Sequence, residues 1–125
     1  LREEKDVPES KVETTDATAT VLHIATIPAS TTVQLEAKVV ARRKSGSAGT
    51  AEDGASYIVV ATVKNVAGVA TLIGAVSQLV VHESQAAWNC TIDVSGSNAR
   101  VVVTGAANNT IAWHLFGCNH RRVSV

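Results

Sequence analysis

VQLEAKVVARR, residues Val33–Arg43, alternates between apolar and polar side chains, with Val40 as the exception. Side chains on a strand point to opposite faces in turn, so this alternation predicts a long strand with one buried face. Its expected partner is the apolar, β-branched stretch Tyr57–Val66. Between them lies Lys44–Gly54, which has no apolar residue larger than alanine. The sequence therefore predicts a β-hairpin with a long, mobile loop.

Other short apolar or alternating stretches repeat this pattern along the chain. They are Val21–Ile27, Val69–Val76, Trp88–Val94, Ala99–Thr104 and Thr110–Phe116. Turn signals such as Ser95–Asn98 and Gly105–Asn109 separate them. Strands separated by turns about every 10 residues, without helical periods between them, are typical of antiparallel sheets. The predicted fold is all-β: an antiparallel β-sandwich, jelly-roll-like, of about eight strands.

The length of 125 residues fits one domain with an appended arm. Residues 1–12 are polar and charged, and we expect an extended N-terminal arm that is ordered against another subunit. Residues 13–125 are expected to form the β-sandwich domain. The chain has one Phe, one Tyr, two Trp and no Met, so its core must consist mainly of small residues. Subunit contacts are expected to add burial.

Charge and hydropathy exclude two classes of partner. The formal net charge is zero at pH 7, which argues against nucleic acid, whose binders carry a basic face. It also argues against electrostatic attachment to a membrane. No apolar run reaches the roughly 20 residues needed to cross a bilayer as a helix, and the acidic first residues are no secretion signal. We expect neither nucleic-acid binding nor membrane insertion.

Metal-ligating residues are few. No pair among His23, His82, His114 and His120 has helical metal-ligand spacing. The best set is His114, Cys118 and His120, because strand alternation puts His114 and Cys118 on one face, and His120 too if Gly117 adds no bulge. A structural interpretation is favoured, so no metal and no cofactor is expected. Cys90 and Cys118 are expected as buried free thiols.

Basic residues gather in two short segments of the sequence. Such clusters are usually solvated strand ends, but His120 with Arg121 and Arg122 could also form a polar patch at a subunit contact. The candidate assembly contacts are Arg42, Arg43, His120, Arg121 and Arg122.

Catalytic motifs are missing from the sequence. Glu52 and Asp53 are adjacent in a segment too flexible to hold them as an acid–base pair. No Gly-x-Ser-x-Gly precedes a helix, and no phosphate loop is indicated. Trp88 shares its strand face with Ile92 and Val94, which favours a core tryptophan over a sugar-binding one. We expect no enzyme and no catalytic residue.

Several segments form a recognisable combination of strand and turn chemistry. They are ETTDATAT (Glu13–Thr20), EAKVVARR (Glu36–Arg43), Tyr57 after a Gly/Ser loop, VAGVATLIGAV (Val66–Val76), WNCTIDVSGSNARVVVTGAANNTIAW (Trp88–Trp113) and a basic-to-valine C-terminus. Together they resemble a small β-rich domain of structural proteins in tailed bacteriophages, often found at or near the end of tail fibres and tail spikes. The resemblance covers roughly Glu13 to Val125.

This resemblance implies a non-enzymatic virion module for host attachment, usually assembled as a homotrimer. The expected partners are further copies, other virion proteins and a host cell-surface glycan. Loops on a rigid β scaffold usually carry recognition, so the candidate recognition loop comprises Ser45, Gly46, Ser47, Gly49, Thr50, Glu52 and Asp53. Two alternatives stay open: a capsid decoration (cement) protein that binds the coat through its arm, and a carbohydrate-binding module that uses Trp88, Trp113 or Tyr57.

Overall fold

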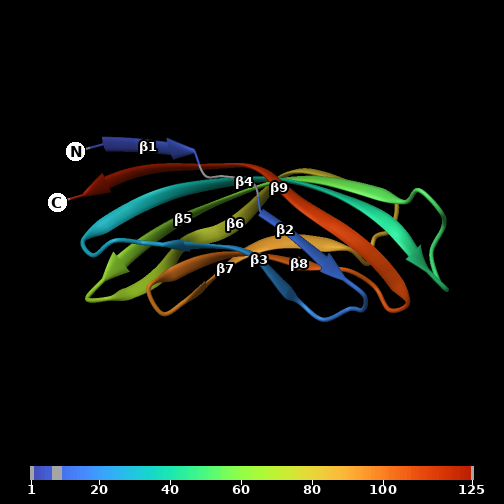
Figure 1. Cartoon of the computed structure of the whole chain (residues 1–125). Coiled ribbons are helices and arrows are strands. Elements are labelled where there is room, and N and C mark those ends of the chain that lie inside the picture. The colour runs from blue at the N-terminus through green and yellow to red at the C-terminus, as the bar shows by residue number, and fades with distance from the viewer. Residues whose placement is uncertain (1, 7–9, 125) are drawn as a thin grey trace.

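Antiparallel strands make up the fold of the computed structural model, which describes the backbone of residues 2–6 and all of residues 10–124. The described residues form nine strands and no helix (Figure 1). The strands are β1 (Arg2–Asp6), β2 (Ser10–Thr14), β3 (Thr20–Thr26), β4 (Thr31–Gly46), β5 (Gly54–Val66), β6 (Val69–Glu83), β7 (Asn89–Ser95), β8 (Asn98–Thr104) and β9 (Asn109–Ser124). The all-β, antiparallel prediction is confirmed, with nine strands in place of about eight.

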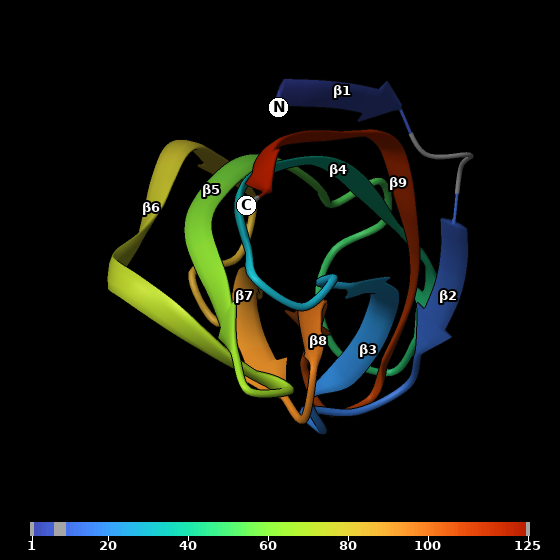
Figure 2. The same ribbon diagram turned by 90° about the vertical axis from the view of Figure 1, so that its left-hand side faces the viewer.

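The strands belong to two sheets of unequal size. The larger sheet has the order β1-β9-β4-β5-β6, with β2 also paired to β9, and the smaller has the order β3-β8-β7. In the end-on view, the smaller sheet faces the β5–β4–β9 part of the larger sheet, and β6 lies to one side (Figure 2). A jelly-roll-like sandwich stays a prediction. No helix of the described residues could cross a membrane.

The central hairpin of the larger sheet follows the predicted alternation. β4 and β5 pair in antiparallel register, with Val33 opposite Val63 and Val39 opposite Tyr57. The alternate β4 side chains that face the core are all at most 4% exposed: Val33, Leu35, Ala37, Val39 and Ala41. Val40, the exception to the pattern, is 44% exposed on the other face. Alternation alone therefore predicts which face of β4 is buried.

The loop between β4 and β5 is shorter than predicted. β4 continues to Gly46, where it still pairs with Asn109 of β9, and β5 begins at Gly54. Residues 47–53 remain outside the strands. A Cβ atom at Gly46 would lie 2.2 Å from the carbonyl oxygen of Asn108, so only glycine lets the two backbones approach this closely.

The described N-terminal residues belong to the larger sheet. β1 pairs with residues 119–123 of β9, and β2 pairs with residues 111–115 of the same strand. The described residues of the expected arm therefore pair within the chain, and its ordering against another subunit stays a prediction. β4 pairs with one edge of β9, and backbone pairing along the other edge satisfies hydrogen bonds of β1 and β2. Pro8 lies outside the described residues.

A strained residue occupies the two-residue turn between β5 and β6. Ala67 has a φ of 53° and Gly68 a φ of 86°, the positive values that a type I′ hairpin requires at both positions. The left-handed region costs alanine about 1–2 kcal/mol, whereas asparagine tolerates it better. We expect Ala67→Asn to raise the free energy of unfolding by about 1 kcal/mol. Denaturant unfolding measures this, and Gly68→Ala is the control of opposite sign.

Candidate functional site

The predicted recognition loop is tied to the rest of the scaffold by Asp53. Its Oδ2 accepts hydrogen bonds from the Thr50 amide at 2.9 Å and from Gln85 Nε2 at 2.7 Å. The Thr50 amide, followed by Gln85 and the charge of Arg43, lowers the pKa of the Asp53 carboxyl from its usual 3.8. The Gln85 bond links this loop to the segment between β6 and β7. Two segments distant in sequence thus form one surface at this end of the sheets.

Arg43 holds the start of the same loop through hydrogen bonds. Its Nε donates to the carbonyl oxygen of Ala48 at 3.1 Å and to Asn109 Oδ1 at 3.2 Å, while Nη2 donates to the carbonyl of Gly46 at 2.7 Å. Three acceptors around one half-buried guanidinium fix the start of the loop. Arg43, predicted as an assembly contact, therefore makes these hydrogen bonds within the chain, to the loop and to the first residue of β9.

Arg42 and Glu52 lie on the exposed side of the loop. Arg42 Nη2 is 3.5 Å from Glu52 Oε1, and both side chains are more than half exposed. Such a pair contributes little to stability. Glu52 has a φ of 72°, a conformation that places it at the tip of a tight turn. Both side chains are accessible to a ligand or to another protein.

The Asp53 hydrogen bonds predict a pH dependence of loop order. A carboxyl whose pKa is lower in the folded chain stabilises the folded loop above its unfolded pKa, and this stabilisation is lost as the pH falls through the folded value. We expect an NMR titration to give Asp53 a midpoint below 3.8, with the Thr50 amide shift moving in parallel. Asp53→Asn should remove that response of Thr50. A midpoint at or above 3.8 contradicts the prediction.

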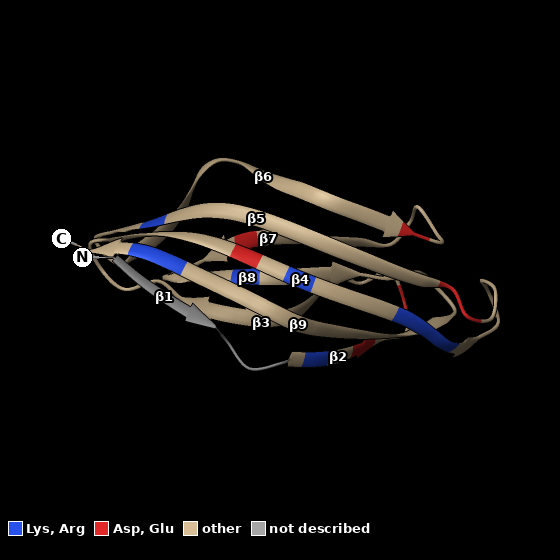
Figure 3. Ribbon diagram, turned by 90° about the horizontal axis from the view of Figure 1, so that it is seen from above, with Lys and Arg blue, Asp and Glu red and all other residues tan. Residues whose placement is uncertain are grey.

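The other three predicted assembly contacts, His120, Arg121 and Arg122, lie far from this loop. Arg42 is opposite Ala112 of β9, while Arg121 is opposite Gln34 of β4. At about 3.3 Å per residue the two basic groups are roughly 25–30 Å apart, and Figure 3 shows them at opposite ends of the sheet. Arg121 lines a polar hollow there with Gln34, Glu36 and Asn119. The structure therefore does not gather the five predicted contacts into one patch.

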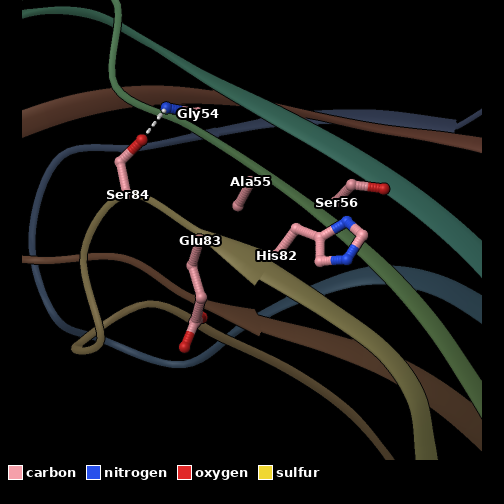
Figure 4. Close-up of a pocket in the computed structure, with 6 residues that line it drawn as sticks. All are labelled: Gly54, Ala55, Ser56, His82, Glu83 and Ser84. Atoms are coloured by element: carbon pink, nitrogen blue, oxygen red, sulfur yellow. Dashed lines mark hydrogen bonds between the residues drawn. The ribbon is translucent and has the colours of Figure 1, made fainter.

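A shallow hollow between β5 and β6 places two serines, a histidine and a glutamate together (Figure 4). Ser84 Oγ accepts a hydrogen bond from the Gly54 amide at 3.0 Å. Glu83 turns away from His82 (Figure 4), and its Oε2 accepts from the Tyr57 hydroxyl at 2.5 Å. A serine–histidine–acid relay needs the acid to hydrogen-bond the histidine. Because Glu83 is hydrogen-bonded to Tyr57 and turned away from His82, the residues of this hollow are not arranged as such a relay.

Three of the four aromatic side chains are core residues. Tyr57, Trp88 and Trp113 are at most 1% exposed. The Trp113 ring lies 6.2 Å from Tyr57 and 5.9 Å from Trp88 between centroids. Its Nε1 donates to Thr14 Oγ1 at 2.8 Å. A sugar-stacking platform must present its face to solvent, so the alternative of a carbohydrate-binding module that uses these three residues is wrong. The prediction of Trp88 as a core residue is confirmed.

Both cysteines are buried free thiols, as predicted. Burial raises the pKa of each thiol to about 12, so both are protonated. The predicted strand face is wrong, however. Cys118 is 2% exposed on the core side, where it is opposite Ala37 of β4, whereas His114 is opposite the outward-facing Val40. His114 and Cys118 therefore lie on different faces of β9.

Four of the nine exposed large apolar side chains among the described residues lie on β6. Its side chains Val69, Ile73, Leu79 and Val81 are between 41% and 64% exposed, and Glu83 at the end of the strand is its one charged residue. β6 is an edge strand of the larger sheet. It lies to one side in Figure 2, where Gln78 donates a hydrogen bond to the carbonyl oxygen of Cys90 in β7 at 2.7 Å. Sequence reasoning missed this surface, although the lack of charge in a 15-residue strand is a signal.

Edge strands normally carry charges, prolines or other features that prevent pairing with another chain. β6 has no charge and no proline before its last residue, although it does contain bulges. A register shift opposite Ala61 loops out residues 74–76, with Gly74 at a φ of 74°. On either side of that bulge, β6 can offer unpaired backbone groups together with apolar side chains. This combination is typical of a surface that packs against another protein.

Comparison with known proteins gives structural neighbours only. No protein-family model matches the chain, and no curated protein matches it significantly. Three similar solved structures are tailspike proteins. The first is the tailspike protein gp49 of Acinetobacter baumannii bacteriophage Fri1, a capsular polysaccharide depolymerase, with 13% identity and a TM-score of 0.45 over 96% of this chain and 17% of that chain. The second is the Acinetobacter baumannii phage AM24 tailspike, with 12% identity and a TM-score of 0.48 over 98% of this chain and 26% of that chain. The third is the Acinetobacter phage vB_ApiP_P1 tailspike, with 14% identity and a TM-score of 0.46 over 91% of this chain and 21% of that chain.

The chain spans between 17% and 26% of the length of these neighbours. Their depolymerase activity, where named, belongs to the whole protein concerned. At these identities and TM-scores the similarity carries no conclusion about function.

Proposed function

We propose that this chain is a non-enzymatic structural module of a tailed-bacteriophage virion, of the tail fibre or tail spike type, which assembles as a homotrimer and takes part in host attachment. The observation that carries the proposal is the uncharged, apolar edge strand β6. The resemblance of the sequence to a virion domain supports it. The tailspike structures named above match too loosely to add to this support.

A second copy of the chain is the occupant that best fits β6. The larger sheet has more strands than the sheet that faces it, and its edge strand β6 leaves Ile73, Leu79 and Val81 exposed. Symmetric packing of identical chains covers every such edge at once. A homotrimer closes if β6 of each copy contacts a different surface of the next one. Val40 and Phe116, 44% and 53% exposed, offer an apolar surface on β4 and β9.

The loop around Glu52 is the surface proposed to face the host. Asp53, Gln85 and Arg43 hold its base in place, so its exposed tip is presented on a firm support. Polar side chains on such a tip suit hydrogen bonding to a cell-surface glycan. In a trimer, three copies would bind together, which raises the avidity of an individually weak contact.

Capsid decoration receives less support. A clamp that reaches the coat needs an N-terminal arm free to leave its own domain, but the described strands β1 and β2 pair with β9 of the same chain. Removal of residues 1–12 tests this alternative. Loss of binding to capsids, with mass and folding unchanged, would favour decoration over the tail module.

The solution mass of the full chain tests the proposed assembly. We expect light scattering after size exclusion to give three times the 13.0 kDa of one chain. A monomer at all accessible concentrations would contradict the trimer. Labelled protein should bind host cells without releasing reducing ends from their capsule. Release of reducing ends would contradict the non-enzymatic part of the proposal, and Glu52→Lys should weaken cell binding without changing the mass.

A further inference from the structure

A β-bulge in β9 reverses which residues face the core. Lys38 and Val39 of β4 are consecutive, but their partners in β9 are Gly117 and Leu115, so Phe116 is an extra residue. Before the bulge the buried residues are Ile111, Trp113 and Leu115, and after it Cys118 is buried. His120, two residues further on, is opposite the fully buried Leu35. The bulge therefore brings Cys118 and His120 to the core side together.

A second register shift, in β3, turns His23 inward. Val21 is opposite Val102 of β8, and His23 is opposite Val101, so Leu22 is the extra residue. Val101 is fully buried, which places His23 on the face of β3 directed at the larger sheet. Bulges that re-aim a side chain are frequent next to functional sites. Here two bulges, in two different sheets, aim side chains at one point.

Three ligand atoms meet at that point. One ring nitrogen each of His23 and His120 and the sulfur of Cys118 all lie within 4.8 Å of one another. Cys118 Sγ and His120 Nε2 are 3.4 Å apart. In tetrahedral zinc sites Zn–S is about 2.3 Å and Zn–N about 2.0–2.1 Å, which separates sulfur from nitrogen by roughly 3.5 Å. The separation between Cys118 and His120 matches that value, and His23 completes the set within 4.8 Å, so closure on an ion needs shifts of about 1 Å.

The surroundings of His23 also fit a ligand. Its Nδ1 is hydrogen-bonded to Ser10 Oγ at 3.2 Å. Ligating histidines commonly make such a bond through the nitrogen that does not bind the metal, which fixes the ring and its tautomer. Burial lowers the pKa of His23, and a neutral imidazole is the form that ligates. Ser10 lies on β2, so the N-terminal strand would support the site.

We propose that His23, Cys118 and His120 form a binding site for a borderline-soft divalent metal ion, with zinc as the first choice. One thiolate and two imidazoles suit zinc better than calcium or magnesium, which prefer oxygen ligands. On binding, a bond forms between the metal and Cys118 Sγ while the thiol proton is released to solvent. Water or a group from another molecule completes the tetrahedron. The ion would join β3 of one sheet to β9 of the other.

Cobalt(II), a spectroscopic substitute for zinc, tests the proposal. The full chain is treated with a chelator, desalted and titrated with Co²⁺ alone. We expect a thiolate-to-cobalt charge-transfer band that saturates at one ion per chain and disappears when Zn²⁺ is added. Cys118→Ser should abolish the band, and His23→Ala should weaken binding at least about tenfold. Ser10→Ala should weaken it by about 10–100-fold, the usual effect of removing an orienting partner.

The matched control is His114→Ala, on the same strand but the opposite face, which should bind Co²⁺ like the unchanged chain. Zn²⁺ should raise Tm for the unchanged chain and for this control, and leave Cys118→Ser unaffected. Should Cys118→Ser fail to fold, protection of the Cys118 thiol by Zn²⁺ against a thiol reagent in the unchanged chain replaces it. No charge-transfer band, a band that survives in Cys118→Ser, or no protection would overturn the proposal.

Discussion

Trp113→Ala is expected to lower the free energy of unfolding by about 3–5 kcal/mol, the usual cost of removing a buried tryptophan. The side chain is fully buried, contacts the rings of Tyr57 and Trp88, and donates a hydrogen bond to Thr14 of β2. The surrounding core relaxes only partly into such a cavity, which adds to the cost of the lost apolar burial. With total stabilities of about 5–15 kcal/mol, this variant is expected to be close to unfolding at 37 °C.

Two further variants separate the parts of this effect. Trp113→Phe keeps most of the apolar volume but leaves Thr14 Oγ1 without its donor, so we expect a loss of about 1–3 kcal/mol. Phe116→Ala removes an aromatic ring on the same strand that is 53% exposed, and it should change stability by no more than about 0.5 kcal/mol. Denaturant unfolding followed by circular dichroism compares all three. An equal effect of Trp113→Ala and Phe116→Ala would contradict the assigned core.

The sequence was informative where one rule of local chemistry decides the outcome. Alternation along Val33–Arg43 predicts the buried face of β4 residue by residue, including the outward Val40, because a strand paired on both edges has no freedom to rotate. The Gly96-Ser97 turn between β7 and β8 likewise follows from its residues, since Ser95 pairs with Asn98. These features depend on neighbours within a few positions.

Features that depend on distant partners were not predictable in this way. The alternation rule places His114 and Cys118 on one face, and it fails because the extra residue Phe116 is defined by the register with β4. His23 reaches the same cluster from another sheet, so no spacing in the sequence indicates it. The loop after β4 is shorter than predicted because Asn109, more than 60 residues away, extends the pairing to Gly46.

The exposure of β6 also depends on distant partners, in this case on the number of strands in the sheet that faces it. The residues of β6 are mostly apolar, as in a buried strand, but several of them are exposed. Burial depends on what faces a strand, and three strands cannot cover the whole of a sheet whose path has five. Apolar sequence with solvent exposure is then the sign of a missing neighbour, which the proposed assembly supplies.

The double variant Leu79→Lys/Val81→Lys should dissociate the proposed trimer. Leu79 and Val81 are 64% and 41% exposed in the single chain, so two lysines cost the monomer little, within about 0.5 kcal/mol each. In an interface the same ammonium groups lose their hydration without gaining partners. At about 2 kcal/mol or more for each of the two central contacts, the dissociation constant should rise by at least about 1,000-fold. Light scattering over a dilution series measures it.

Ile24→Lys is the matched control, because Ile24 is 54% exposed on β3 of the other sheet. It makes the same change of chemistry at similar exposure, and the proposed interface predicts no effect on mass. Dissociation by both variants would show that added positive charge, whatever its position, separates the copies. A trimer that survives the β6 variant would mean that another surface holds it together. Dissociation by the β6 variant alone, with an unchanged Tm of the monomer, is the result that the uncovered edge strand requires.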